Sequence, residues 1–135
     1  KILTYQIYMH NISLYLTSAC LGIIIFFSII LAPTVFKVLD KESASRYLRA
    51  FFPKFYLFLF GVSGIAAILS NNTIIATMLA ITSFLFLFSR WPLTTAINNA
   101  TDKKNSKMFK LLHGFSVSIV LLQISMMLSL FFINF

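Results

Sequence analysis

Two histidines have the widest chemical range of the side chains in this sequence. His10 lies in the first apolar run and His113 in the last, and a pair of imidazoles inside a membrane could ligate a haem iron or a metal ion. Each histidine lies near the start of its own expected helix, and the two helices run in opposite directions. About 30 Å of hydrocarbon would then separate the two rings. A shared ligand site is therefore not expected, and His10 is interpreted as an interfacial aromatic residue.

His113 lies about one turn inside the last expected helix, close to Lys107 and Lys110. Ionisable groups inside a membrane are costly and are often functional. The neighbouring positive charges favour the neutral imidazole, which could be a structural anchor that hydrogen-bonds Asn98, Asn99 or a backbone carbonyl. The sequence leaves two interpretations open, a structural anchor and a functional contact.

Further polar side chains gather near the start of the last helix. The candidate functional cluster comprises His113, Asn98, Asn99, Arg90, Asp102, Ser116 and Gln123. Its simplest interpretation is a solvated loop with a turn at Thr101-Asp102, and the alternative is a binding site. Gln123 lies deep in the last apolar run, and we expect it to hydrogen-bond across to another helix.

Chemistry that needs carboxylates or an activated nucleophile is not expected. No Asp or Glu lies inside an apolar run, so a buried proton relay or a carboxylate-bridged metal pair lacks its main component. Cys20 is the single cysteine, which excludes an internal disulfide or a CxxC pair. The serines of the apolar runs lack a G-x-S-x-G context and are expected to hydrogen-bond their own backbone four residues back: Ser13, Ser28, Ser116, Ser118 and Ser125. We therefore expect no enzyme, no catalytic residue, no cofactor and no bound metal.

Membrane-spanning helices must position these groups. The 135-residue chain is 59% hydrophobic and only 10% charged, which is too apolar for a soluble domain. We predict an all-α fold, an integral membrane four-helix bundle in a single domain, residues 1–135, with spans at about 9–32, 54–70, 73–90 and 107–132. The first run is too long for a signal peptide and lacks a small-residue cleavage pattern.

Turn and cap residues separate the predicted spans. Ala32-Pro33 is expected to end the first span, and Pro53 to open the second. Trp91-Pro92 is expected to end or kink the third at the headgroup level, and Ser106 to cap the fourth. Between the first two spans, apolar residues recur at helical spacing over Phe36 to Pro53, which predicts a cytoplasmic interfacial amphipathic helix.

Charge sets the predicted orientation. All but one of the 11 Lys and Arg residues fall in Lys37 to Lys54 and Arg90 to Lys110. The positive-inside rule then places both charged loops in the cytoplasm and both termini outside, in a membrane that we expect to be the bacterial inner membrane. The expected partners are anionic lipid headgroups and other membrane subunits or further copies of the chain, not nucleic acid. Headgroup contacts are assigned to Lys37, Lys41, Arg46, Arg49 and Lys54.

Small residues four apart are expected to let the helices approach closely inside the bundle. These pairs are Ser18 and Gly22, Ser63 and Ala67, Ala76 and Ala80, and Gly114 and Ser118.

Short motifs along most of the chain resemble the transmembrane-protein-205-like family of small four-helix membrane proteins. The motifs are Ala32-Pro33-Thr34-Val35-Phe36, Phe51-Phe52-Pro53-Lys54-Phe55-Tyr56, Asn98 before a short charged loop, and Leu112-His113 followed by Ser116 and Gln123. The resemblance implies that the polar residues gather at the cytoplasmic face. It implies no reaction.

Three hypotheses about function follow. The first is a non-catalytic accessory or assembly subunit that packs against other membrane subunits. The second is a small oligomeric permease or exporter, whose polar stripe of His113, Ser116 and Gln123 would be ragged, because Gln123 lies about 80° off the line from His113 to Ser116 at 100° per residue. The third is a haem- or quinone-binding redox subunit with His113 as ligand. The first hypothesis accounts best for the missing catalytic groups and the abundance of Phe.

Overall fold

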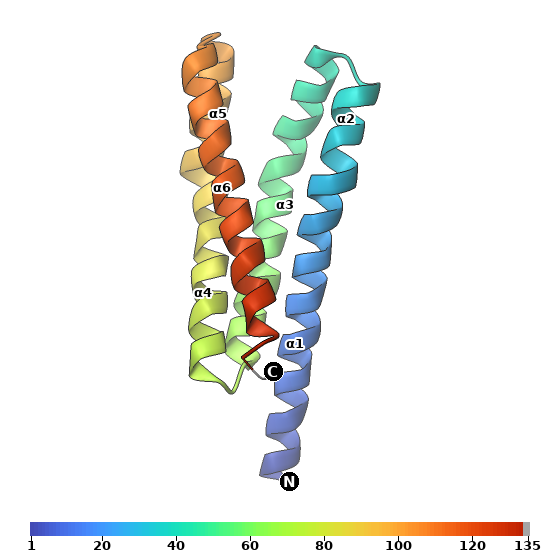
Figure 1. The fold of residues 1–135 in the computed structure, drawn as a ribbon, viewed down its shortest axis with the longest axis vertical. Coiled ribbons are helices and arrows are strands. Elements are labelled where there is room, and N and C mark those ends of the chain that lie inside the picture. The colour runs from blue at the N-terminus through green and yellow to red at the C-terminus, as the bar shows by residue number, and fades with distance from the viewer. Residues whose placement is uncertain (134–135) are drawn as a thin grey trace.

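Four long helices account for almost all of residues 1–133, which are the residues that the computed structural model describes (Figure 1). The elements are α1 (Ile2–Phe26), η1 (Phe27–Leu31), α2 (Ala32–Val38), α3 (Lys41–Leu69), α4 (Thr73–Phe88), η2 (Ser89–Leu93), α5 (Thr94–Asp102) and α6 (Ser106–Leu130). The first three elements form one continuous helix, as do α4, η2 and α5. All four long helices are long and apolar enough to cross a membrane, which confirms the all-α prediction and indicates an integral membrane protein.

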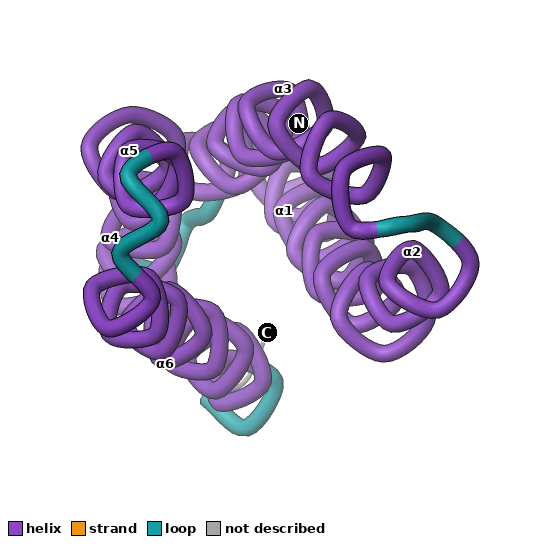
Figure 2. Tube along the Cα trace, turned by 90° about the horizontal axis from the view of Figure 1, so that it is seen from above, coloured by secondary structure: helices purple, strands orange, loops and turns teal. Residues whose placement is uncertain are grey.

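The helices alternate in direction and pack as an open ring. Contacts join α1 to α3, α3 to α4, α4 to α6 and α6 to α1, and the view down the bundle shows this order (Figure 2). The turns at residues 39–40 and 103–105 lie at one end, called here the charged end. Residue 1 and the turn at residues 70–72 lie at the opposite end (Figure 1).

Two prolines coincide with short π-helical segments, η1 and η2. Pro33 directly follows the turn of η1, and Pro92 lies inside η2. A proline lacks the N–H group and clashes with the carbonyl four residues back, and a wider π turn moves that carbonyl away. Nearby hydroxyls cover carbonyls at these sites, since Thr34 Oγ1 donates to Ile30 O at 2.6 Å and Thr94 Oγ1 to Ser89 O at 2.6 Å. The first helix therefore continues to Val38 and the third to Asp102, past the ends predicted at the prolines.

Residues 41–53 belong to α3 itself. The sequence predicted a separate amphipathic helix over this stretch and a second span that Pro53 opens, but α3 is continuous from Lys41, and Pro53 lies inside it. The break before α3 is only two residues long, Leu39 and Asp40. Prolines are tolerated inside membrane-spanning helices, where neighbouring groups can satisfy the freed backbone carbonyl.

Polar side chains cap three of the helices. Asp40 Oδ1 accepts hydrogen bonds from the backbone N–H groups of Glu42 and Ser43 at 3.1 and 2.9 Å, and Asn72 caps α4 in the same way. Asn105 caps α6, where Oδ1 accepts from Met108 N at 3.1 Å. The prediction that Ser106 is this cap was wrong by one residue, and the predicted turn at Thr101-Asp102 is the last part of α5.

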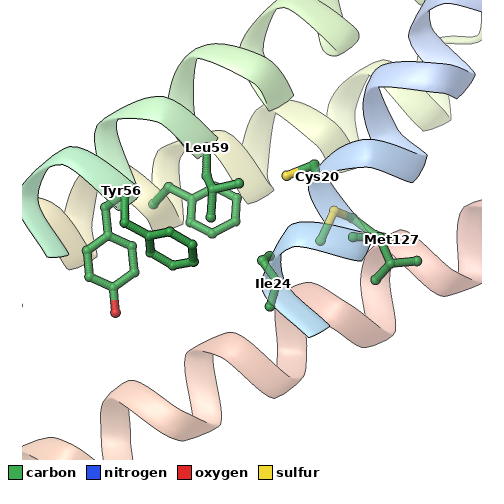
Figure 3. Packing of buried hydrophobic residues seen from close by; sticks show 8 residues of the cluster. Cys20, Ile24, Tyr56, Leu59 and Met127 are labelled. Atoms are coloured by element: carbon green, nitrogen blue, oxygen red, sulfur yellow. The ribbon is translucent and has the colours of Figure 1, made fainter. Parts of the chain in front are cut away.

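The core lies on the inner faces of the helices. Its larger cluster joins α1, α3, α4 and α6 through buried side chains that include Cys20, Ile24, Tyr56, Leu59 and Met127 (Figure 3). A second cluster near the opposite end contains Ala66, Ile75, Leu79 and Leu130. On α6, all buried residues lie from Ile119 onward, so the half of α6 towards the charged end is not enclosed by the other helices.

Candidate functional site

The predicted polar cluster does not form one site. Asp102, at the end of α5, makes an ion pair with Arg49 of α3, with Nη2 2.5 Å from Oδ1 and Nη1 3.2 Å from Oδ2. This salt bridge joins α3 to α5, and its two residues lie 53 positions apart in the sequence. Arg49 was assigned to lipid headgroups, but its guanidinium is directed at a carboxylate of the same chain.

The other members near the charged end face different neighbours. The Arg90 guanidinium carbon lies 5.1 Å from the ring centroid of Trp91, at cation–π distance. The exposed His113 ring stacks on Phe109, with centroids 5.7 Å apart. Among residues 1–133, the structure shows no hydrogen bond from His113 to Asn98 or Asn99, the two side chains named as partners of a structural anchor.

Gln123 makes the interhelical contact that the sequence predicted. Its side chain is fully buried, and Nε2 donates to Thr82 O of α4 at 3.0 Å. Within the described chain, the buried Oε1 of Gln123 and Oγ1 of Thr82 have no partner. Gln123 therefore ties α6 to α4 with one bond.

Two buried hydroxyls make similar contacts that sequence reasoning missed. Ser13 Oγ donates to Ala66 O at 2.7 Å, joining α1 to α3, and Ser83 Oγ donates to Phe60 O at 2.9 Å, joining α4 to α3. Ser13 was expected to bond its own helix, as Ser118 and Ser125 do. The signal that could have found Ser13 is its place on one face with Thr17, Cys20 and Ile24.

Ser116 and Gln123 lie on the same inner face of α6, because seven residues bring a helix back to within about 20°. Ser116 interacts with the side chain of Tyr56 on α3, whose hydroxyl points away from its own helix (Figure 3). The stripe predicted from His113, Ser116 and Gln123 is ragged only because His113 does not belong to it. His113 is exposed on another face of the helix.

The outer faces of α1 and α6 carry the small residues that the sequence placed inside the bundle. Ser18 and Gly22 on α1, and Gly114 and Ser118 on α6, are all exposed. A Cβ atom added at Gly22 or Gly114 would meet nothing within 4 Å. That prediction was wrong for these two pairs, because four-residue spacing identifies a smooth face without identifying the side of the helix that faces the bundle.

Gly64, unlike Gly22 and Gly114, has a packing role inside the bundle. A Cβ atom there would lie 3.2 Å from Ser83 Oγ, so this glycine lets α3 and α4 approach closely. Glycine inside a helix costs about 0.5–1 kcal/mol relative to alanine. Gly22 and Gly114 carry that cost with no packing benefit inside the monomer, which makes the outer faces of α1 and α6 the candidate functional site.

The opposite end has an open depression that includes His10. Leu3, Gln6, Ile7, Asn71 and Asn72 complete its lining, and Asn71 Nδ2 donates to Gln6 O at 2.5 Å. His10 and His113 lie towards opposite ends of the bundle, as the topology predicted. Among residues 1–133, no three His, Cys, Asp or Glu side chains are grouped to hold a metal ion.

Comparison with known proteins gives one match. Residues 15–133 match a family described as "Domain of unknown function (DUF4149)", so the match covers most of the chain and all four long helices. No curated protein and no solved structure matches the chain.

Proposed function

The chain belongs to the DUF4149 family, and we propose that it is a non-catalytic membrane protein that packs against other membrane subunits as an accessory or assembly component. The observation that carries the proposal is the pair of exposed glycines on the outer faces of α1 and α6. In a bilayer, helices associate where small residues let two backbones approach closely. The partner is therefore a transmembrane helix of another subunit.

Each glycine lies one turn from an exposed serine whose hydroxyl is already satisfied. Ser18 Oγ donates to Leu14 O at 2.8 Å, and Ser118 Oγ donates to Gly114 O at 2.9 Å. Neither serine therefore presents an unpaired hydroxyl to a neighbouring helix. A smooth surface of this kind suits close van der Waals packing against a second helix better than it suits polar recognition.

The basic side chains support a second part of the proposal, which is orientation. Ten of the 11 Lys and Arg side chains lie on the parts of the helices towards the charged end, and we propose that this end faces the cytoplasm and anionic headgroups. Lys37, Lys41 and Arg46 are exposed for such contacts, and so is Lys54. The first turns of α3 would then lie at the headgroup level.

The resemblance to the transmembrane-protein-205-like family implies a small membrane protein of uncharacterised function. The family match and the four long apolar helices agree with that coarser statement. The specific resemblance remains part of the proposal, carried by the motifs around Pro33, Pro53 and His113.

A second candidate function is a small oligomeric permease, favoured by the polar inner face of α6 with Ser116 and Gln123. It needs a pathway between copies of the chain.

Bulky side chains at the exposed glycines test the proposal. Because Gly22 and Gly114 have open space around them, Gly22→Leu and Gly114→Leu should leave the monomer folded and remove its association with the partner. The measurement is a native gel of the protein extracted in mild detergent at native expression level, with the co-migrating proteins identified by mass spectrometry.

Ala80→Leu is the matched control, because Ala80 is an exposed small residue on α4, outside both proposed faces. The proposal predicts a larger assembly with a second protein for the wild type and for Ala80→Leu, and its loss in at least one glycine variant. A wild-type chain that migrates only with copies of itself would contradict it and favour the permease. An assembly that survives in both glycine variants would show that these faces are not the interface.

A further inference from the structure

The half of the bundle towards the charged end divides into two arms. The first arm is residues 32–53, comprising α2 and the first part of α3, and its tip is the short turn at residues 39–40. The second arm is residues 94–114, comprising α5 and the first part of α6, and its tip is the turn at residues 103–105. Figure 1 shows that the ribbons of α2 and α6 diverge towards this end, and Figure 2 shows the ring open between them.

Each helix carries a helix-weakening residue at the base of its arm. The three prolines of the chain are Pro33 beside η1, Pro53 inside α3 and Pro92 inside η2. α6 has Gly114 at the corresponding place. Proline and glycine are the residues that cost a helix interior most, and sharp bends occur at prolines and π-bulges.

η1, Pro53, η2 and Gly114 lie close to one layer across the bundle, and Pro33 lies about 9 Å nearer the charged end, because it follows Phe27 by six residues of helix. Phe27 of η1 packs on Phe51 and Phe55, with ring centroids 5.4 and 4.7 Å apart, so η1 lies beside Pro53. The Ser83–Phe60 bond joins α4 to α3, and about 10 Å further along these antiparallel helices η2 comes beside the same part of α3. The interaction of Tyr56 with Ser116 brings Gly114 to that level.

The polar contacts between helices differ on the two sides of this layer. On the side of the opposite end, hydrogen bonds from Ser13, Ser83 and Gln123 to carbonyls of neighbouring helices lock the bundle. On the side of the charged end, the Arg49–Asp102 ion pair is the one polar side-chain contact between the arms among residues 1–133. The buried residues near the two tips are small, Ala44 and Ala100, so they bury little apolar area.

Charge opposes closure of the arms. Lys37, Lys41 and Arg46 lie on the first arm, and the second arm carries Lys103 and Lys104 at its tip. Lys107 and Lys110 add further positive charge to the second arm. Like charges repel across the space between the tips, and the ion pair is the attractive contact that counters them.

We infer that the charged end opens and closes about the layer of η1, Pro53, η2 and Gly114, with Pro33 directly beyond η1, and that the Arg49–Asp102 ion pair is the latch that holds the arms closed. Opening separates α3 from α5 near their tips and leaves the locked half unchanged. The latch and the tips of the arms lie apart from the outer faces of α1 and α6 that carry the proposed function, and Gly114 belongs both to the hinge layer and to the outer face of α6.

Distances between spin labels on the two arms test the latch. Labels at Lys37→Cys and Lys103→Cys, in a chain whose buried Cys20 is replaced by alanine, report the distance between the tips in lipid nanodiscs. Wild-type side chains at the latch should give one dominant distance, and Asp102→Asn should add a longer and broader population. The charge swap Arg49→Asp with Asp102→Arg should restore the dominant distance, and Glu42→Gln, which removes a charge outside the latch, should leave it unchanged.

Two results would overturn the inference. One is a distance distribution in Asp102→Asn that matches the wild type. The other is an equal change for a second pair of labels in the locked half, at Thr77→Cys and Ser125→Cys, because the whole bundle would then move. Pro33→Ala with Pro92→Ala tests the hinge layer, since regular helices should shrink the longer population in Asp102→Asn several-fold. An undiminished longer population would place the hinge elsewhere.

Discussion

Single polar atoms hold neighbouring helices together in the locked half. The bonds that Ser13, Ser83 and Gln123 make to carbonyls of other helices contribute about 1 kcal/mol each, since polar contacts inside a membrane have modest net value. Their larger effect is on register, because each bond requires one donor opposite one carbonyl. This explains why the inner faces carry hydroxyl and amide groups.

Gly64 is the residue at which the packing of α3 against α4 is most sensitive. Gly64→Ala places a methyl group 3.2 Å from Ser83 Oγ, which is held in place by its bond to Phe60 O. Displacing that hydroxyl should cost about 1–3 kcal/mol through crowding, more than the gain of about 1 kcal/mol from alanine in a helix. Thermal unfolding in detergent should show a lower Tm for this variant.

Gly61→Ala is the control, because a Cβ atom there meets nothing within 4 Å. It should raise the Tm through helix propensity alone. Ser83→Ala should turn Gly64→Ala from destabilising to neutral or stabilising, since it removes the obstructing hydroxyl. Equal Tm values for Gly64→Ala and Gly61→Ala would show that the close approach at Gly64 is unimportant.

The sequence predicted some of these contacts between helices and missed others. Gln123 was correctly expected to reach another helix, because a buried amide in an apolar run needs a partner. The Arg49–Asp102 pair was not predicted, since both residues belong to charged stretches with several equivalent partners. The sequence could not predict whether the Ser18–Gly22 and Gly114–Ser118 faces point into the bundle or outwards either. In a membrane helix, the side that faces lipid and the side that faces the bundle are both apolar.

At the scale of the helices, the predicted boundaries differ from the structure mainly at the prolines. The length and apolarity of the runs predicted four long helices, and they are present. Pro33 and Pro53 were interpreted as boundaries and Pro92 as an end or a kink, but π turns lie at Pro33 and Pro92, and α3 continues through Pro53. Local propensity cannot predict this, because neighbouring helices and the Thr34 and Thr94 hydroxyls supply the compensation.

The start of α3 depends on the Asp40 cap, which gives this helix a pH response. Hydrogen bonds led by the one from Ser43 N hold the pKa of the Asp40 carboxyl below its ordinary value. A group with a lowered pKa stabilises the folded state above its unfolded pKa, and this contribution is lost as the pH falls through the folded value. Asp40→Ala should therefore lower the Tm measurably at pH 7, and the difference from wild type should shrink as the pH falls through the folded pKa, because the part that depends on the ionised carboxylate is lost.

Asp40→Asn separates the cap from the charge. Asparagine accepts the same backbone hydrogen bonds, so this variant should keep most of the stability at pH 7 and should show no loss of cap strength on acidification. A deficit in Asp40→Ala that persists unchanged at pH 3 would count against a role for the ionised carboxylate.

At the scale of the whole molecule, much of the surface of residues 1–133 is apolar and exposed along the helices. Ser13, Ser83 and Gln123 of the locked half donate to carbonyls of neighbouring helices, and the ion pair joins the two arms. What remains exposed along the apolar helices is a set of large hydrophobic side chains interrupted by two smooth faces around Gly22 and Gly114. This distribution fits a protein that works by contact inside the membrane.

Site-specific photo-crosslinking in intact membranes tests that claim most directly. A photoreactive amino acid is placed at Ser18 or Ser118, on the smooth faces, or at Phe84, which is 64% exposed on α4. The account predicts a discrete crosslinked protein band from at least one of the serine positions and none from Phe84. The same pattern at all three positions, with lipid adducts alone or no band, would contradict it.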